Sequence, residues 1–338
     1  MDHVQFPDKD KAKEELQRLT QDQNEYVRQF SAVVLSTDFA YGIKAWENLI
    51  RFTQVKSASV RRPAIDALGI IFAYVPDKTK AWEDLHRLTE DQHEDVRRLA
   101  AGALGRAFAY VPDKDGAWED LHRLTQDTNN DVVWRATVAL GCAFAYVPDK
   151  DGAWGDLHRL TQDQNNFIRN GAAYALGCAF AHLPDKDEAW EDLLRLVEDK
   201  TRDVRRRAAG ALDYAFALSP DKDKAWEDLI RLTYFHDGFV RRRAADVLGY
   251  AFVHLSDKEK AWEDLIKIIQ NTSNDDVKLH VANTLGDAFS HLSQKDQAQE
   301  DLKKLTKNKN RGVRRRATII LSNAPTNLPE NAKRDRRT

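Results

Sequence analysis

Apolar residues recur along the chain at helical spacing, in pairs of segments that short polar stretches separate. In residues 77–90 the apolar positions are Ala81, Trp82, Leu85 and Leu88. In residues 95–110 they are Val96, Ala100, Ala103, Leu104, Ala107 and Phe108. Steps of three and four residues place each set on one face of an α-helix, and no segment of the sequence alternates apolar and polar residues as a half-buried strand does. The pattern therefore predicts an all-α chain built from helix pairs.

The helix pair repeats every 36 residues. Windows 109–144 and 145–180 are identical at 27 of 36 positions. Seven tryptophans in the first helices of the pairs keep this step: Trp46, Trp82, Trp118, Trp154, Trp190, Trp226 and Trp262. A marker residue in the second helices counts nine units: Val27, Val60, Val96, Val132, Ile168, Val204, Val240, Val277 and Val313. A fixed period of this length is typical of solenoids, in which each unit packs only on its neighbours. Although 338 residues would suit two globular domains, the pattern predicts one solenoid over residues 1–323.

The two ends of the chain depart from the repeat. Lys13 and Gln299 replace the tryptophan in the first and last units. Polar replacements suit capping repeats, because the outer face of a terminal repeat meets water. Residues 324–338 contain two prolines followed by a basic run, and this composition predicts a disordered basic tail.

The second helices carry a recognisable motif, seen in the third unit as Asp91-x4-Val96-Arg97-x2-Ala100-Ala101-x-Ala103-Leu104-Gly105. This motif resembles the HEAT repeat, in particular its bilin-lyase-like variant. The accompanying Trp-Glu-Asp-Leu signature is similar to repeat arrays of methanogenic archaea. The resemblance covers residues 8–323 and implies a HEAT-like α–α superhelix of about nine repeats with a right-handed twist.

In HEAT repeats the aspartate and the arginine of this motif form a stacked ladder between neighbours. The resemblance therefore implies four ladder pairs, which are Asp22 with Arg28, Asp91 with Arg97, Asp163 with Arg169, and Asp199 with Arg205. We expect the ladder to be interrupted, because Val133 stands where Asp127 would find its arginine and four units have another residue at the aspartate position.

Histidines and cysteines also recur one repeat apart. His86, His122 and His158 occupy equivalent positions, as do Cys142 and Cys178. Neighbouring helices pack about 8–10 Å apart, whereas zinc ligands lie within about 2.1 Å of one ion and a disulfide needs Cα atoms within about 7 Å. We therefore expect no metal site, a half-exposed histidine stripe, and two free, mostly buried thiols, as is typical of a reducing compartment.

The sequence shows no signature of catalysis or of membrane insertion. It contains no Gly-x-Ser-x-Gly, His-Glu-x-x-His, Gly-x-Gly-x-x-Gly or phosphate-binding Gly-x4-Gly-Lys-Ser/Thr motif. No apolar run approaches the roughly 20 residues that a membrane span needs, and the first residues lack the basic and apolar regions of a secretory signal. The sequence therefore predicts a cytoplasmic protein that is no enzyme, holds no cofactor and has no membrane partner.

The repeats differ from one another along one line of the second helix. Windows 109–144 and 145–180 differ mainly in the inter-helix loop and the first two turns of the second helix. Positions two, six and ten after the marker residue vary most, and steps of four place them in one row. In the HEAT family the second helix lines the concave surface, which implies an extended recognition surface there. Neutral drift is the alternative, but drift would also have scattered changes over the first helices.

The candidate partner-binding residues on this line and beside it are Arg98, Trp134, Arg135, Asn170, Tyr174, Arg206, Arg207, Tyr214, Arg242, Arg243, Asp246 and Tyr250. The tryptophans of the 36-residue series are predicted core residues, because an apolar stripe at helical spacing is usually buried. Trp134 lies outside that series. We expect it to face outward, either as a binding anchor or packed against an adjacent side chain.

Charge is unevenly distributed along the chain. The net charge of −2 divides into −12 for residues 1–302 and +10 for residues 303–338. Arginine triplets begin the second helices at residues 205–207, 241–243 and 314–316, and the second and third arginine of each are expected to be largely exposed. Such a gradient steers an acidic partner or a nucleic acid; a solubilising end cap is the alternative.

Four functional hypotheses follow. The leading one is a non-catalytic scaffold that binds a protein or peptide, possibly an acidic one, on the concave face. The second is a nucleic-acid-binding protein similar to HEAT-like DNA glycosylases, which would use the basic C-terminal half. The third, from the repeat variant alone, is a bilin-lyase-like protein. The fourth is a set of recently duplicated or designed repeats with no dedicated ligand.

Overall fold

The computed structural model describes residues 42–55, 58–75 and 77–323, and every regular element in these ranges is helical. The first helices of the pairs are α3 (Gly42–Thr53), α5 (Lys78–Thr89), α7 (Lys114–Leu124), α9 (Lys150–Thr161), α11 (Lys186–Val197), α13 (Lys222–Leu232), α15 (Lys258–Asn271) and α17 (Lys295–Leu305). The second helices are α4 (Ala58–Ile71), α6 (Glu94–Ala107), α8 (Asn130–Ala143), α10 (Asn166–Ala179), α12 (Arg202–Leu218), α14 (Gly238–Ala251), α16 (Asp275–His291) and α18 (Arg311–Asn323). The predicted all-α repeat of helix pairs is confirmed for these residues.

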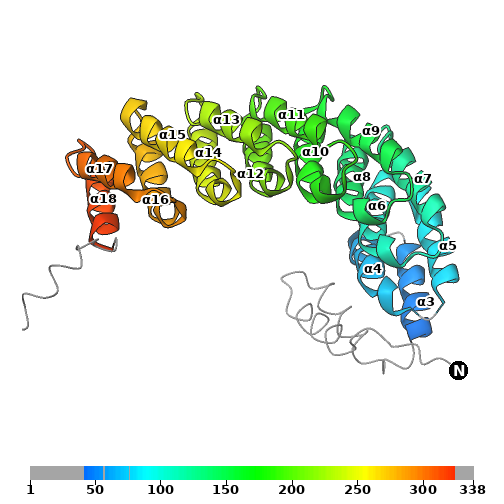
Figure 1. The fold of residues 1–338 in the computed structure, drawn as a ribbon. Coiled ribbons are helices and arrows are strands. Elements are labelled where there is room, and N and C mark those ends of the chain that lie inside the picture. Colours follow the sequence, from blue (N-terminus) through cyan, green and yellow to red (C-terminus); the bar gives the residue numbers. More distant parts are fainter. Residues whose placement is uncertain (1–41, 56–57, 76, 324–338) are drawn as a thin grey trace, which may run out of the picture. The chain divides into compact units, whose positions relative to one another are not determined.

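The chain divides into two compact units, residues 1–211 and residues 212–338, and the division falls within α12. In each unit, successive second helices pack against one another, as α6 does on α8 and α14 on α16. First helices pack on the second helix of their own pair, as α9 does on α10 and α13 on α14. Figure 1 shows this alternation of first and second helices along the chain. The division of the chain into a solenoid of residues 1–323 and a tail stays a prediction, because residues 324–338 lie outside the described ranges.

The core of each unit lies between the two helices of a pair and between neighbouring pairs. All seven tryptophans of the 36-residue series are buried, with at most 9% of their surface exposed. The phenylalanines that end several second helices are fully buried beside them, as Phe108 and Phe144 are. The prediction that the serial tryptophans are core residues is therefore confirmed. Within the described residues, no helix combines the length and the apolar character that crossing a membrane requires.

An Asp-Lys pair joins second helices to the next first helix from α5 to α15, and Gln294 replaces the aspartate before α17. Asp113 is the N-cap of α7, and its carboxylate accepts a hydrogen bond from the backbone N–H of Gly116 at 2.9 Å. Lys114 reaches back, and its Nζ donates to the carbonyl oxygens of Phe108 and Val111, both at 2.7 Å. Lys150 makes the equivalent two bonds one repeat later, to the carbonyl oxygens of Phe144 and Val147. The same pair of residues thus caps the helix that begins and the helix that has just ended.

Neighbouring second helices approach each other most closely at a glycine nine residues after the marker. A Cβ added at Gly141 would lie 2.4 Å from the Cα of Ala175, and one added at Gly105 would lie 2.8 Å from the Cα of Ala139. Because no side chain separates the backbones here, the residues at position ten can meet across the interface. Cys142 and Cys178 are the residues at this position in α8 and α10.

The cysteines are free, as predicted, but they are exposed. The expectation that they are mostly buried is wrong, because position ten lies on the outer side of the second helices. The average helix spacing assumed from the sequence is too large for the interface of α8 and α10, where a Cβ at Gly141 would lie 2.4 Å from the Cα of Ala175.

Candidate partner-binding surface

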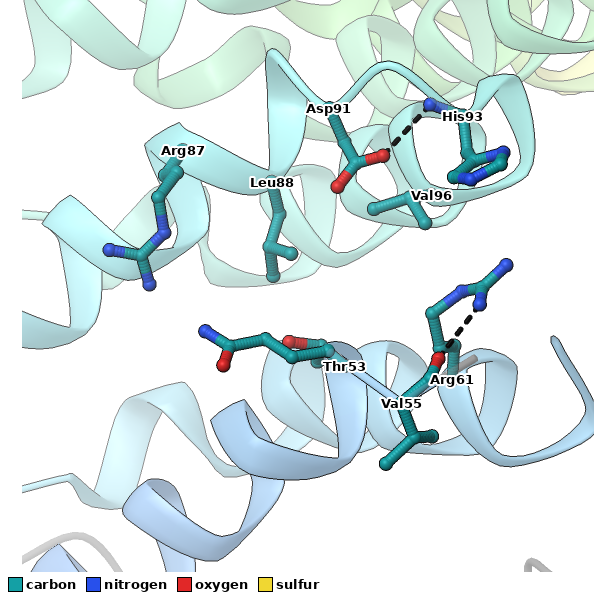
Figure 2. Close-up of a pocket in the computed structure, with 9 residues that line it drawn as sticks. Thr53, Val55, Arg61, Arg87, Leu88, Asp91, His93 and Val96 are labelled. Atoms are coloured by element: carbon teal, nitrogen blue, oxygen red, sulfur yellow. Dashed lines mark hydrogen bonds between the residues drawn. The ribbon is translucent and has the colours of Figure 1, made fainter. Parts of the chain in front are cut away.

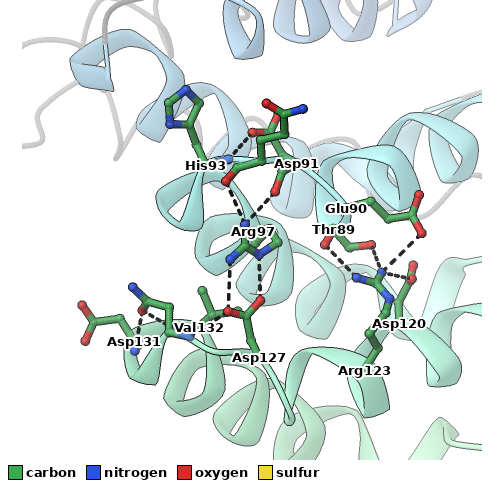
Figure 3. A network of polar contacts seen from close by, with 12 residues as sticks. Thr89, Glu90, Asp91, His93, Arg97, Asp120, Arg123, Asp127, Asp131 and Val132 are labelled. Carbon is green, nitrogen blue, oxygen red and sulfur yellow. Dashed lines mark hydrogen bonds and ion pairs between the residues drawn. The ribbon is translucent and has the colours of Figure 1, made fainter.

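Arginines one residue after the marker hold the inter-helix loops together. The Nη1 of Arg97 donates to the carbonyl oxygens of Asp91 and Gln92 at 2.7 and 3.1 Å (Figure 3). The arginines that make the equivalent two bonds are Arg169, Arg205, Arg241 and Arg314. Because the acceptors are backbone carbonyls, this contact needs no aspartate. Arg241 and Arg314 make it to the carbonyls of Phe235 and Asn308, which stand at the aspartate position.

The side-chain ion pairs of the ladder join each arginine to the next loop and not to its own. Arg97 forms a two-bond pair with Asp127, with Nε–Oδ2 at 2.7 Å and Nη2–Oδ1 at 3.1 Å (Figure 3). Arg169 pairs in the same way with Asp199, at 2.6 and 3.0 Å. Both arginines are largely buried at these pairs. Bidentate pairs of this kind are among the strongest that proteins form.

This geometry corrects the pairing expected within each unit. Three of the expected pairs lie in the described ranges, and in each of them the arginine reaches the backbone carbonyl of the aspartate and not its carboxylate. These pairs are Asp91 with Arg97, Asp163 with Arg169, and Asp199 with Arg205. For Arg97 and Arg169 the expectation is wrong because the arginine side chain extends toward the following unit, where the next aspartate lies.

The ladder of ion pairs is interrupted one unit later than the sequence predicted. Asp127, expected to lack an arginine, has Arg97. Val133 stands where an arginine would otherwise reach Asp163, so this carboxylate is the one that loses its ladder arginine. Asp163 accepts a hydrogen bond from the backbone N–H of Asn165 at 2.7 Å.

The fourth expected ladder pair belongs to the first unit. Both of its members, Asp22 and Arg28, lie outside the residues that the structure describes. The pairing of Arg28 with Asp22 therefore stays a prediction. The three described pairs argue against it, since none of them joins the two side chains of one unit.

A second polar network links successive first helices. The Nδ1 atoms of His86, His122 and His158 lie 2.7, 2.6 and 2.8 Å from carboxylate oxygens of the next first helix, those of Asp120, Asp156 and Asp192. The histidine side chains are 46%, 49% and 31% exposed, so the predicted half-exposed stripe is confirmed. Each ring is held by a buried carboxylate, which the sequence alone did not indicate. No group of His, Cys, Asp and Glu in the described part of the chain could hold a metal ion.

A cavity of about 470 Å³ lies between the loops of the first two described helix pairs (Figure 2). Its charged lining groups are already engaged. Arg61 donates to the carbonyl of Val55 at 2.8 Å, and Asp91 accepts from the backbone N–H of His93 at 2.8 Å (Figure 2). Arg87 pairs with Asp84 at 2.5 Å. The cavity is thus a gap between loops, and its polar groups stabilise the loops and helices around it.

Trp134 is half-buried and packs against the next second helix. Its ring stacks on Phe167 of the next second helix, with centroids 5.1 Å apart and planes inclined by 16°. A Cβ at Gly171 would lie 2.7 Å from the indole Cδ1, so this glycine makes the room that the indole occupies. Of the two alternatives for Trp134, packing against an adjacent side chain describes it. Phe167, which the sequence interpretation did not single out, is the exposed member of the pair, at 42%.

Three further candidates in residues 1–211 are half-buried and make internal contacts. Arg98 donates to Asp95 at 3.0 Å, and the side-chain amide of Asn170 donates to the carbonyl of Asp203 at 3.0 Å. The guanidinium of Arg135 lies over Gly102, and burial lowers its pKa. Asn170 and Arg135 thereby connect neighbouring second helices, while Arg98 pairs within its own helix.

The exposed candidates of residues 1–211 are Tyr174, Arg206 and Arg207. Arg207 lies over the ring of Tyr174, with its Cζ 5.3 Å from the ring centroid. A cation held against an aromatic face in this way keeps both groups in a fixed position at the surface. Tyr174 retains 39% of its surface exposed.

In residues 212–338, Tyr214 and Tyr250 occupy position ten of successive second helices and are 70% and 73% exposed. They are the most exposed of the large hydrophobic side chains in the described ranges. Arg242 is exposed and lies 3.7 Å from the carboxylate of Asp276. Asp246 is engaged internally, since its Oδ1 lies 2.6 Å from the Nδ1 of His280. The two tyrosines therefore form the outermost part of this surface, which we call the tyrosine patch.

Asp213 occupies the position that is glycine in six other second helices, among them Gly177 and Gly249. It pairs with Arg243, but its Oδ1 and the Nε of Arg243 are buried without a hydrogen-bond partner among the described residues. Burial raises the pKa of Asp213 to about 6, against the opposing charge of Arg243.

The arginine triplets are therefore only partly exposed. Arg243 is half-buried against Asp213, and Arg316 is half-buried and donates to the carbonyl of Asn283 at 3.1 Å. For these two the expectation of large exposure is wrong, because the third triplet position faces the preceding second helix. The triplet arginines that are exposed as expected are Arg206, Arg207, Arg242 and Arg315.

Asp213→Asn is expected to change how stability depends on pH. A carboxyl whose folded pKa is raised stabilises the fold below its unfolded pKa, and this contribution is lost as pH rises through the folded value, here about 6. The asparagine variant does not ionise, so its stability relative to wild type should improve by about 1 kcal/mol between pH 5 and pH 7.5. Thermal unfolding of the full chain at several pH values measures this difference. A Tm difference that stays constant over that range would contradict it.

Known proteins resemble this chain in fold and not in sequence. No protein-family model and no curated protein sequence matches the chain. Importin β, crystallised in ammonium sulfate, superimposes with a TM-score of 0.65 and 12% identity over 90% of this chain and 45% of its own. Kap95p bound to RanGDP gives 0.61 and 13% over 92% of this chain and 47% of that chain. The Escherichia coli protein YibA gives 0.50 and 17% over 85% and 97%.

The chain is a helical solenoid. It spans less than half the length of the importin β and Kap95p chains that it resembles. Identities of 12% to 17% carry the shared fold and no shared activity.

Proposed function

We propose that this protein is a non-catalytic scaffold that binds a protein or peptide on the outer surface of its second helices. The observation that supports this most is the tyrosine patch, Tyr214 and Tyr250, with Arg242 on the same helix as Tyr250. Tyrosine and arginine are enriched at protein interfaces and among the residues that dominate binding energy. Two side chains of this kind, each more than two-thirds exposed, gain most from a partner that covers them.

A second contact area in residues 1–211 consists of Tyr174, Arg206 and Arg207. Its arginines suit a partner that presents carboxylates, which guanidinium groups bind through two hydrogen bonds. The comparison with Kap95p, a solenoid bound to the protein RanGDP, is consistent with a protein partner. Around both areas the frame residues repeat and the surface residues differ, as an adaptable recognition surface requires.

The nucleic-acid alternative is weaker, because many arginines of the triplets are already used. Arg205, Arg241 and Arg314 hold loop carbonyls, and Arg243 and Arg316 make internal contacts. Phosphate binding by the remaining arginines would fall steeply with salt. A bilin-lyase-like activity would need a ligand pocket, and the charged groups around the cavity of the described residues are engaged.

Replacing both tyrosines of the patch, Tyr214→Ala with Tyr250→Ala, should weaken binding of the partner at least about ten-fold, because truncating a tyrosine at a binding hot spot costs about 2 kcal/mol or more. The partner is first captured from the source cell and identified, and its Kd for each purified variant is then measured by calorimetry.

The matched control is Tyr110→Ala with Tyr146→Ala. These tyrosines are 49% and 53% exposed, but they lie in the turns η3 (Phe108–Tyr110) and η4 (Phe144–Tyr146) that follow α6 and α8. The control should bind as wild type does. Equal affinity of the patch variant and wild type would refute the proposal.

A further inference from the structure

Three guanidinium groups lie side by side on the outer surface of α6. Arg98, Gly102 and Arg106 follow one another at steps of four in this helix, so they share one face and neighbours are about 6 Å apart. The guanidinium of Arg135, from α8, occupies the middle of this row, because a Cβ added at Gly102 would lie 2.2 Å from its Nε and 2.7 Å from its Cζ. The order along the surface is therefore Arg98, Arg135, Arg106, which we call the arginine row.

Arg135 differs from the other basic side chains that stand three residues after the marker. Each of those meets a group of the preceding second helix, in the contacts of Arg207 with Tyr174, Arg243 with Asp213, His280 with Asp246, and Arg316 with Asn283. Arg135 meets Gly102, which has no side chain. Within the described ranges, no hydrogen bond or ion pair holds its guanidinium.

The surroundings of the arginine row contain too few carboxylates. Asp95 accepts a hydrogen bond from Arg98 at 3.0 Å and also lies 4.0 Å from Arg62. Asp66 accepts one from Arg106 at 3.0 Å. Burial, and then the charges of the two flanking arginines, lower the pKa of the middle arginine, although Asp66 opposes them. Four guanidinium groups thus share two carboxylates, and an anion placed at the middle one would relieve their repulsion.

We propose that the arginine row binds an acidic, extended segment of the protein partner, one carboxylate of which pairs with Arg135. The inference rests on the proposed function and names the chemistry of the segment that residues 1–211 bind. A guanidinium binds a carboxylate through two parallel hydrogen bonds. Because Arg135 is half-buried, such a pair is screened less by salt than one at an exposed arginine.

The spacing of the arginine row matches an extended peptide. Successive positions of the row are about 6 Å apart, and side chains on one face of an extended chain repeat every about 6.7 Å. Acidic residues at alternate positions of the segment therefore place successive carboxylates along the row. Arg98 and Arg106 use Nη2 for their own aspartates, so their Nε and Nη1 donors can meet the outer carboxylates.

The probe is a synthetic, fluorescently labelled peptide in which three glutamates alternate with glycines. Its Kd for the full chain is measured by fluorescence anisotropy at low salt. Wild type should bind it saturably, and should bind the same peptide with glutamines, or with the three glutamates in succession, more weakly. Arg135→Gln should weaken binding at least about ten-fold, because the carboxylate loses a charge-assisted pair.

A second variant closes the site from within. In α14, Asp246 stands six residues after the marker and pairs with His280, just as Gly102 stands opposite Arg135. Gly102→Asp puts a carboxylate at the equivalent position. The atoms it would meet belong to the flexible side chain of Arg135 and not to backbone, so the guanidinium can shift and pair with it. Peptide binding should be lost.

Gly102→Asn is the matched control, because it adds a side chain of the same size without the charge. It should bind the peptide more tightly than Gly102→Asp does. Circular dichroism and thermal unfolding show that each variant is folded.

The results that would overturn the proposal are distinct from those that test partner binding. No saturable binding by wild type, equal affinity for the alternating and the successive glutamates, or unchanged affinity in both Arg135→Gln and Gly102→Asp would contradict it. Tighter binding of an oligodeoxynucleotide of equal charge, lost in the same two variants, would assign the row to phosphates instead. The peptide measurement uses no captured partner, so its failure would leave binding at the tyrosine patch standing.

Discussion

Asp199→Ala should lower the free energy of unfolding by about 3 kcal/mol, because it leaves the guanidinium of Arg169 buried without its carboxylate. Each side chain of this pair is 9% exposed, and two hydrogen bonds of 2.6 and 3.0 Å join them. Burial raises the pKa of Asp199, but the hydrogen bonds from Arg169 and Thr201 outweigh it, and the net pKa is lowered. The carboxylate is therefore charged at neutral pH. Arg169 keeps its bonds to two loop carbonyls, which sets the expected loss at the lower end of the range for broken buried pairs.

The neighbouring loop supplies a matched control in Asp163→Ala. Asp163 accepts a backbone hydrogen bond from Asn165 at 2.7 Å, just as Asp199 accepts one from Thr201 at 2.7 Å. Since Val133 replaces the arginine that would reach Asp163, its removal should cost only about 1 kcal/mol, the value of a local cap. Chemical denaturation of both variants measures the difference. Equal losses would show that the buried ion pair adds nothing to the frame.

Gly141→Ala should destabilise the protein by about 2 kcal/mol, although alanine is the better helix former by about 1 kcal/mol. The atoms that a Cβ would meet are the Cα, Cβ and carbonyl oxygen of Ala175, at 2.4, 2.6 and 2.7 Å. Most of these atoms belong to the backbone, so the strain can be relieved only if α8 and α10 move apart.

Gly210→Ala is the control, with an expected effect of the opposite sign. Gly210 lies within α12, and a Cβ there would meet nothing within 4 Å. The substitution should therefore stabilise the protein by up to about 1 kcal/mol through helix propensity alone. Thermal or chemical unfolding of the two variants gives both signs. A stabilising Gly141→Ala would contradict the close approach of the second helices.

The sequence predicted what depends on period. The 36-residue step and the apolar stripes were enough for the helix pairs, the buried tryptophans and the half-exposed histidines, because identical units pack in identical ways. The sequence did not predict contacts that depend on how one repeat is displaced relative to the next. Arg97 reaches the next loop at Asp127 and not its own carboxylate, and nothing in the spacing of one unit fixes that reach.

The candidate surface was predicted less well, for two physical reasons. An average distance between helices does not apply where glycine meets alanine, so the close approach of α8 and α10 at Gly141 was missed. A side chain at an outward position can also fold over a glycine of the next unit, as Trp134 does at Gly171. The pairing of a large residue with a glycine one unit later is the signal that could have revealed this packing.

The central claim is that a protein partner binds the outer surface of the second helices, and side-chain footprinting of the complex tests it most directly. Hydroxyl radicals oxidise exposed tyrosines, and four exposed tyrosines report on two surfaces in one experiment. Addition of the captured partner should protect Tyr214 and Tyr250 and leave Tyr110 and Tyr146 as reactive as in the free protein. Protection of Tyr110 and Tyr146 with Tyr214 and Tyr250 unchanged would place the partner elsewhere and contradict the claim.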